Sequence, residues 1–179
     1  MNPAPNLVLV GPMGAGKTTI GKRLAQQLGL TFVDADHRLE ELTGAPVPLI
    51  FECEGEAGFR ARESALIAEL CAGSGQLIAT GGGAVLSTEN RNCLREHGYV
   101  VYLQVSVAQQ LQRLARDRSR PLLASGDKEE KLAALAKIRQ PLYLELADLV
   151  FDSDGLSLPH AAERLHDLIE SRWQRAMAA

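Results

Sequence analysis

The chain has 179 residues, of which 46% are apolar and 23% are charged, so it can bury one core and is neither disordered nor collagen-like in composition. Its 19 basic and 22 acidic residues leave a net charge of −3, which provides no overall attraction to nucleic acid or to an anionic membrane. The sequence contains no apolar run of the roughly 20 residues that a membrane span needs, and no signal peptide is recognisable. Three cysteines without metal-ligand spacing are typical of reduced thiols, which predicts a cytoplasmic protein.

Strands and helices are expected to alternate along the chain. Residues 7–10 form a short apolar run before Gly11, which predicts a buried strand, and Ile20, Leu24 and Leu28 lie four apart on one face of a helix over 18–28. In chain order, we then expect a strand at 31–34, a helix at 64–70, strands at 77–80 and 99–105, helices at 107–114 and 128–146, a strand at 149–151 and a helix at 159–173.

This alternation predicts an α/β fold in which a five-stranded parallel sheet lies between two layers of helices. We expect one domain over 1–179, with its core at about 7–34 and 77–112 and a C-terminal part at about 128–176. The stretch 35–63 is too long for a simple crossover and is predicted to be a helical substrate-binding insert. The stretch 113–127 is rich in arginine and is interrupted by Pro121, which predicts a mobile lid.

Residues 11–18 read GPMGAGKT and match the P-loop pattern, in which a glycine-rich turn joins a strand to a helix. Backbone N–H groups of such a turn surround a phosphate, the lysine (Lys17) reaches the β- and γ-phosphates, and the hydroxyl of Thr18 binds Mg²⁺. A chance glycine turn is the alternative, but the preceding strand and following helix favour the P-loop. Thr19 is read from the pattern alone as an ordinary helix residue.

The P-loop indicates a nucleoside triphosphate, and the rest of the chain narrows the class. An Asn-Lys-x-Asp guanine motif is missing from the sequence, and the length suits a small-molecule kinase better than a motor. Asp34 and Asp36 stand two apart at the end of a predicted strand, so both carboxylates are expected to face one pocket, where one acts through Mg²⁺-bound water and the other accepts a hydroxyl proton. Alternatively, Asp36 only caps the next helix.

Basic residues and glycines supply the remaining candidates. Arg60 could bind an anion or could belong to a surface helix on which it pairs with Glu63, three residues later. The three glycines at 81–83 follow a strand and expose backbone to a ligand. Arginines bind phosphates and carboxylates bidentately. Further candidates of this kind are Arg113, Arg120 and Arg139, whereas Arg62, Arg116 and Arg118 are expected to be solvated.

Together these stretches resemble the shikimate kinase family, within the nucleoside-monophosphate-kinase-like branch of P-loop folds. The matching segments run in order from about residue 7 to residue 148, and the combination is far more specific than the P-loop alone. They read GPMGAGKTTIGKRLA, FVDAD, GEAGFRARE, ATGGGAV, RPLL and RQPLYLELAD.

The resemblance implies phosphorylation of the 3-hydroxyl of shikimate by ATP, a step of chorismate and aromatic amino acid biosynthesis, in a monomer that uses one Mg²⁺. Thr18 would bind Mg²⁺ directly and Asp34 through water. Lys17, Asp36 and Arg120 would be the catalytic residues. The shikimate-binding residues would be Asp36, Arg60, Gly82 and Arg139. The ATP-binding residues would be Gly14, Ala15, Gly16, Lys17, Thr18, Thr19, Arg113 and Arg120.

Two other functions remain open at this point. One is a related gluconate or nucleotide kinase, although paired arginines for a carboxylate argue against a nucleobase acceptor. The other is a nucleotide-binding module without activity, which would be expected to lack Lys17, Asp36 or Arg120, whereas all three are present.

Overall fold

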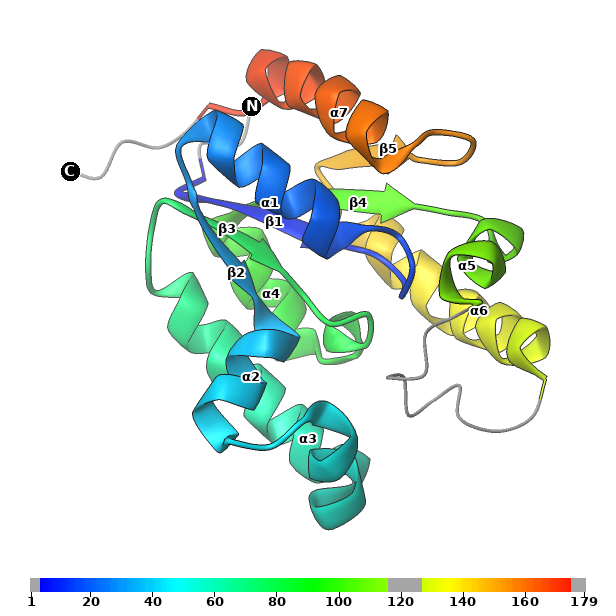
Figure 1. Ribbon diagram of the computed structural model, residues 1–179. Coiled ribbons are helices and arrows are strands. Elements are labelled where there is room, and N and C mark those ends of the chain that lie inside the picture. Colours follow the sequence, from blue (N-terminus) through cyan, green and yellow to red (C-terminus); the bar gives the residue numbers. More distant parts are fainter. Residues whose placement is uncertain (1–3, 116–126, 175–179) are drawn as a thin grey trace.

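The computed structural model describes residues 4–115 and 127–174 as an α/β fold with a central sheet (Figure 1). The sheet is parallel throughout, and its strand order is β2-β3-β1-β4-β5. This confirms the predicted five-stranded parallel sheet and the P-loop kinase class. The strands are β1 (Asn6–Val10), β2 (Thr31–Asp34), β3 (Gln76–Ala79), β4 (Gly98–Gln104) and β5 (Leu149–Asp152).

Helices cover both faces of the sheet. On one side α1 packs against α7, and on the other lie α2, α3, α4 and α6 (Figure 1). The helices are α1 (Lys17–Leu28), α2 (Ala35–Thr43), α3 (Val47–Cys71), α4 (Thr88–His97), α5 (Val107–Leu114), α6 (Lys128–Leu146) and α7 (Leu158–Arg172), and a 3₁₀ turn, η1, covers Ala84–Leu86.

The central strand shows why two layers of helices form. Side chains alternate between the faces of a strand, so Leu7 and Leu9 of β1 enter the core under α1 and α7, whereas Val8 and Val10 enter the core under α3, α4 and α6. All four are fully buried. Both faces of the strand are therefore apolar, as in a parallel sheet covered on each side.

The helices differ from expectation in one case and include one that the sequence did not predict. The helix predicted at 64–70 is the end of α3, which starts at Val47 and bends at Gly55, where φ is 70°. Helix α4 was not predicted, because it buries only Asn90 and Leu94 and so lacks an apolar stripe. Its N-terminus nevertheless carries a cap, since the Ser87 hydroxyl accepts a hydrogen bond from the backbone N–H of Asn90.

The lid predicted at 113–127 falls mostly outside the described residues. Its first residues, Arg113 and Leu114, form the end of α5. The chain is described again at Asp127, which caps α6. Over the described ranges, none of the helices combines the length and apolarity needed to cross a membrane.

Candidate active site

A cavity of about 550 Å³ opens at the carboxyl ends of β1, β2 and β3. The strand order places these three ends side by side, and ligands of open α/β sheets bind at this edge. The cavity brings together most of the residues predicted from the sequence. Those that line it are Gly14, Gly16, Lys17, Thr18, Thr19, Asp34, Asp36, Arg60, Gly82 and Arg139.

The P-loop lies between β1 and α1, as predicted. Gly16 has φ 89° and is the residue before α1, and a Cβ there would lie 2.6 Å from Leu158 Cδ2, so glycine is required. The Lys17 ammonium donates hydrogen bonds to the carbonyl oxygens of Gly11 (2.7 Å) and Pro12 (2.9 Å). The lysine is therefore held over its own loop, beside the N-terminus of α1, where a phosphate would be stabilised.

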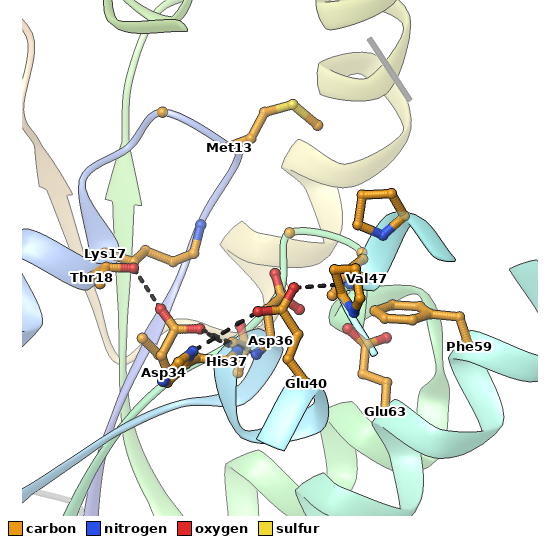
Figure 2. Close-up of a pocket in the computed structure, with 18 of the residues that line it drawn as sticks. Met13, Lys17, Thr18, Asp34, Asp36, His37, Glu40, Val47, Phe59 and Glu63 are labelled. Carbon is orange, nitrogen blue, oxygen red and sulfur yellow. Dashed lines mark hydrogen bonds and ion pairs between the residues drawn. The ribbon is translucent and has the colours of Figure 1, made fainter. Parts of the chain in front are cut away.

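Asp34 joins the P-loop to the insert. Its Oδ2 accepts a 2.6 Å hydrogen bond from the Thr18 hydroxyl, and its Oδ1 accepts from the backbone N–H groups of Asp36 and His37 (Figure 2). Asp34 is therefore the N-cap of α2. This corrects two expectations: β2 ends at Asp34, so Asp36 is not a strand residue, and Asp36 is not the cap.

Asp36 instead lies in the first turn of α2 and lines the cavity together with Asp34. Figure 2 shows it between Thr18 and Asp34 on one side and Phe59 and Glu63 on the other. A Cβ built on Gly81 would lie 2.8 Å from Asp36 Oδ1 and 2.7 Å from Glu63 Oε1. Glycine at this position therefore lets the loop after β3 approach both carboxylates.

Arg60 makes the predicted ion pair with Glu63, with 2.7 Å between Nη1 and Oε2, but the pair is not on the surface. Glu63 is 0% exposed, and both residues line the cavity. The Arg60 guanidinium also lies 5.2 Å from the centre of the Phe59 ring and contacts the loop at Gly83. Arg60 is thus fixed by its neighbours, and its charge faces the pocket.

Glu63 also lines the cavity, although the sequence indicates it only as a partner of Arg60. Its position carried a signal, because residue 63 falls on the same helical face as the buried Leu66, Ile67 and Leu70. Burial raises the pKa of Glu63, and the nearby Asp36 carboxylate adds to the rise, while the guanidinium groups of Arg60 and Arg139 oppose it.

The raised pKa of Glu63 predicts a pH-dependent stability. The protonated Glu63 carboxyl contributes to stability. This contribution is fully present below the ordinary pKa of 4.5, and it is lost as the pH rises through the raised pKa that Glu63 has in the folded protein. Glu63→Gln lacks this titration, so its free energy of unfolding, relative to wild type, should increase as the pH rises above 4.5. Urea unfolding at several pH values measures the difference. Glu69→Gln, exposed on the same helix, is the control, and a pH-independent difference for Glu63→Gln would contradict the prediction.

Arg139, on α6, also lines the cavity and is 5% exposed. Its Nε has no hydrogen-bond partner among the described residues. A Cβ on Gly82 would lie 3.4 Å from Arg139 Nη1, so the loop after β3 also closely approaches this guanidinium. The cavity thus has two guanidinium groups in its lining, Arg60 and Arg139.

Two of the predicted residues that the structure describes, Ala15 and Arg113, do not line the cavity. The Ala15 side chain is buried in the core under α1 and α7, which leaves only its backbone for a ligand. The Arg113 guanidinium donates to the Gly14 carbonyl (3.1 Å) and to the Ser153 carbonyl (3.3 Å), so it supports the P-loop from behind. Arg120 lies outside the described residues. Arg62 pairs with Glu54 at 2.7 Å on the exposed side of α3, in keeping with the solvated role expected for it.

Comparison with known proteins gives a consistent result. A family model described as shikimate kinase matches residues 13–170. The chain is 53% identical over 175 residues to a shikimate kinase of Stenotrophomonas maltophilia, covering 98% of this chain and 97% of that protein. A shikimate kinase of Pseudomonas syringae is 58% identical over 149 residues, covering 83% and 87%.

Solved structures agree with the sequence comparison. A shikimate kinase from Acinetobacter baumannii in complex with shikimate superposes with a TM-score of 0.90 at 48% identity, covering 94% of each chain. A shikimate kinase from Aquifex aeolicus superposes with a TM-score of 0.78 at 27% identity, covering 93% of this chain and 98% of that one. The family match covers most of the chain, and the relatives match over nearly their whole length. The chain therefore belongs to the shikimate kinase family.

Proposed function

We propose that the chain transfers the γ-phosphoryl group of ATP to the 3-hydroxyl of shikimate, giving shikimate 3-phosphate and ADP. The observation that carries this is one cavity that joins a P-loop, at Lys17 and Thr18, to a carboxylate, Asp36, and to two guanidinium groups, Arg60 and Arg139. A phosphate-binding end thus faces an end suited to a hydroxylated carboxylic acid. The Acinetobacter relative, solved with shikimate, supports this choice of acceptor.

At the nucleotide end, the backbone N–H groups of residues 14–19 and the Lys17 ammonium would bind the phosphates of ATP. The hydrogen bonds from Lys17 to the Gly11 and Pro12 carbonyls would be exchanged for contacts to the β- and γ-phosphate oxygens. Arg113 is held against the Gly14 carbonyl, where it would fix the shape of the loop. Its guanidinium would lie near the adenine from this position.

The chain offers a fitting site for Mg²⁺. The Thr18 hydroxyl and the Asp34 carboxylate lie 2.6 Å apart at the edge of the phosphate-binding end, and such oxygens are the ligands that Mg²⁺ prefers. We infer that Thr18 binds one Mg²⁺ directly and Asp34 through water. When bound, the ion would reduce the negative charge on the phosphate oxygens.

At the acceptor end, Arg60 and Arg139 would bind the carboxylate of shikimate, and the backbone of Gly82 would contact its ring. Asp36 would accept the proton of the 3-hydroxyl as the oxygen bonds to phosphorus and the bond from phosphorus to ADP breaks. Glu63 holds Arg60 in place. The Glu63 carboxylate also lies near Asp36. Because two adjacent negative charges repel, it favours uptake of the proton by Asp36.

A coupled assay of ADP release with shikimate, gluconate and AMP as separate acceptors tests the proposal. We expect turnover with shikimate and little with the other two. Faster turnover with gluconate or AMP would assign a different kinase activity. If none of the three acceptors raised the rate of ADP release above the rate without acceptor, the chain would be a nucleotide-binding module.

The carboxylate-binding role predicts the effect of a conservative change. Arg139→Lys keeps the charge but loses the planar pair of donors. It should weaken shikimate binding by about 1.5–3 kcal/mol, the scale of a charge-assisted hydrogen bond. Calorimetric titration measures this, with ATP binding as the internal reference. Unchanged shikimate affinity would show that Arg139 does not bind the carboxylate.

We also propose that the protein is a cytoplasmic monomer. The free thiols of Cys53, Cys71 and Cys93 are consistent with a reducing compartment, which also supplies the ATP. Each chain has its own complete set of P-loop, acidic and basic residues around one cavity. Gel filtration with light scattering tests the monomer.

A further inference from the structure

Tyr143 links two parts of the acceptor end that are far apart in the sequence. It lies one turn after Arg139 on α6 and is 2% exposed. Its hydroxyl donates a hydrogen bond to the carbonyl oxygen of Gly82, 61 residues earlier in the chain. The Arg139 guanidinium approaches the same loop, since a Cβ on Gly82 would lie 3.4 Å from Arg139 Nη1. A buried hydroxyl and a guanidinium, both on α6, therefore meet at the glycine loop after β3.

The ring that carries this hydroxyl is fixed from the sheet. Tyr143 stacks on Tyr102, with 4.9 Å between ring centres and 26° between ring planes. Tyr102 belongs to β4 and pairs with Val10 of the central strand β1. Offset aromatic stacking of this kind holds both rings in place. The Tyr143 hydroxyl is therefore positioned by the rigid centre of the fold.

The chemistry of the hydroxyl sets the direction of both contacts. A phenol has one proton to donate and lone pairs to accept with. Because the proton goes to the Gly82 carbonyl, the lone pairs stay available to a donor, and the Arg139 guanidinium beside the same loop can only donate. Burial raises the pKa of Tyr143, so the proton stays in place at neutral pH.

The three groups also converge in space. A Cβ on Gly82 would lie 3.5 Å from the Tyr143 hydroxyl oxygen and 3.4 Å from Arg139 Nη1. The Gly82 backbone and the Arg139 guanidinium both line the cavity, and Tyr143 lies behind them, outside its lining. A small movement of either group would change the shape of the acceptor end.

We propose that Tyr143 is a positioning residue, which holds the Arg139 guanidinium and the Gly82 backbone in the arrangement that receives the acceptor. The proposal rests on the proposed function in that the acceptor is shikimate. Tyr143→Phe would keep the stacked ring and remove the oxygen, leaving the Gly82 carbonyl and the guanidinium with one buried partner fewer. The affinity for the acceptor would fall, whereas the rate of phosphoryl transfer would not change, since neither group contacts the reacting phosphorus.

Enzyme kinetics with a matched control test this. Tyr143→Phe should raise both KM and Kd for shikimate by about 5- to 50-fold, the loss expected when buried polar groups lose a partner. The value of kcat should stay within about 3-fold, and Kd for ATP should not change. Tyr102→Phe removes the same atom from the other ring of the stacked pair, and should leave the KM for shikimate unchanged. Equal effects of the two substitutions, or none from either, would overturn the proposal.

A second substrate separates positioning from general damage. Shikimate methyl ester lacks the negative charge that Arg139 would bind, so its affinity should fall less than about 3-fold in Tyr143→Phe, within the range of one weak contact. An equal loss for acid and ester would mean that Tyr143 does not act through the guanidinium.

A measurement on the free protein does not depend on the acceptor. In ¹⁵N NMR spectra of arginine side chains, the wild-type Arg139 guanidinium should rotate slowly, and Tyr143→Phe should make it rotate faster. A freely rotating Arg139 in the wild type would overturn the proposal even if the variant failed to fold. A restrained Arg139 in a protein that neither binds nor phosphorylates shikimate would instead refute the proposed function and leave the positioning role standing.

Discussion

Replacing Asp36 with asparagine should lower turnover by about 10²- to 10⁴-fold, the range for loss of a positioned general base. Asparagine has nearly the same shape but cannot take up the proton of the acceptor hydroxyl. Asp36 lies in the cavity between the Thr18–Asp34 pair and Glu63, where a hydroxyl between nucleotide and carboxylate sites would be located. A single-turnover assay at saturating ATP and shikimate measures the change.

The structure makes this variant easy to interpret. Asp34, not Asp36, caps α2, so the substitution leaves the helix start intact. It removes one negative charge from the first turn of the helix, which costs about 0.3–1 kcal/mol of stability. It also relieves repulsion with Glu63. Asp36→Asn should therefore fold normally, as thermal unfolding can confirm.

Glu41→Gln serves as the control for Asp36→Asn. Glu41 lies on the same helix, is exposed, and pairs with Arg38 at 3.0 Å on the surface. Such surface pairs contribute little to stability. The turnover of the Glu41→Gln variant should therefore match that of the wild type. A folded Asp36→Asn enzyme with near-normal turnover would show that Asp36 does not accept the proton.

The local parts of the site were predictable from the sequence, because their geometry is set within a few residues. The P-loop is one turn between a strand and a helix, and its glycines, Lys17 and Thr18 lie where the motif places them. Asp34 and Asp36 were expected in one pocket, and they are, but for a different reason. The chain changes from strand to helix between them, so both face the cavity through the cap of α2.

The features that the sequence did not predict depend on contacts between residues far apart in the chain. Glu63 looks like a surface partner of Arg60 until the loop after β3 is seen to approach it in the fold. Tyr143 looks like an ordinary core residue until its hydroxyl is seen to reach Gly82. Helix α4 has almost no apolar face, so periodicity could not reveal it. In each case the deciding neighbour comes from another element, which single-sequence patterns do not encode.

The basic residues of the cavity leave one requirement of phosphoryl transfer unmet. Among the described residues that line it, the lysine and arginines are Lys17, Arg60 and Arg139. Arg60 is paired with Glu63, Arg139 approaches the loop at Gly82, and we propose that both bind the acceptor. Lys17 alone serves the phosphate end. Charge that develops on the transferring phosphoryl group and on ADP is commonly stabilised by an added arginine.

We expect Arg120 to supply that charge. It lies outside the described residues, and its expected role rests on the resemblance of the Arg-Pro-Leu-Leu segment to the shikimate kinase family. Pro121 limits the conformations of the chain next to it. An arginine that stabilises phosphoryl transfer is worth about 10³- to 10⁵-fold in related enzymes. Arg120→Ala should therefore lower turnover by at least about 10²-fold, with a smaller effect on shikimate binding.

Arg118→Ala is the matched control, since it removes the same group two residues earlier in a segment expected to be solvated there. Its turnover should be close to wild type. Both variants are compared at saturating ATP and shikimate, so that the measured rate reports the transfer step and not binding. If both variants lose only a little turnover, and by the same factor, the segment does not contribute a charge to the reaction. In that case Lys17, with the bound Mg²⁺, would have to stabilise the phosphates without an arginine from this segment, because Arg60 is paired with Glu63 and Arg139 would bind the acceptor carboxylate.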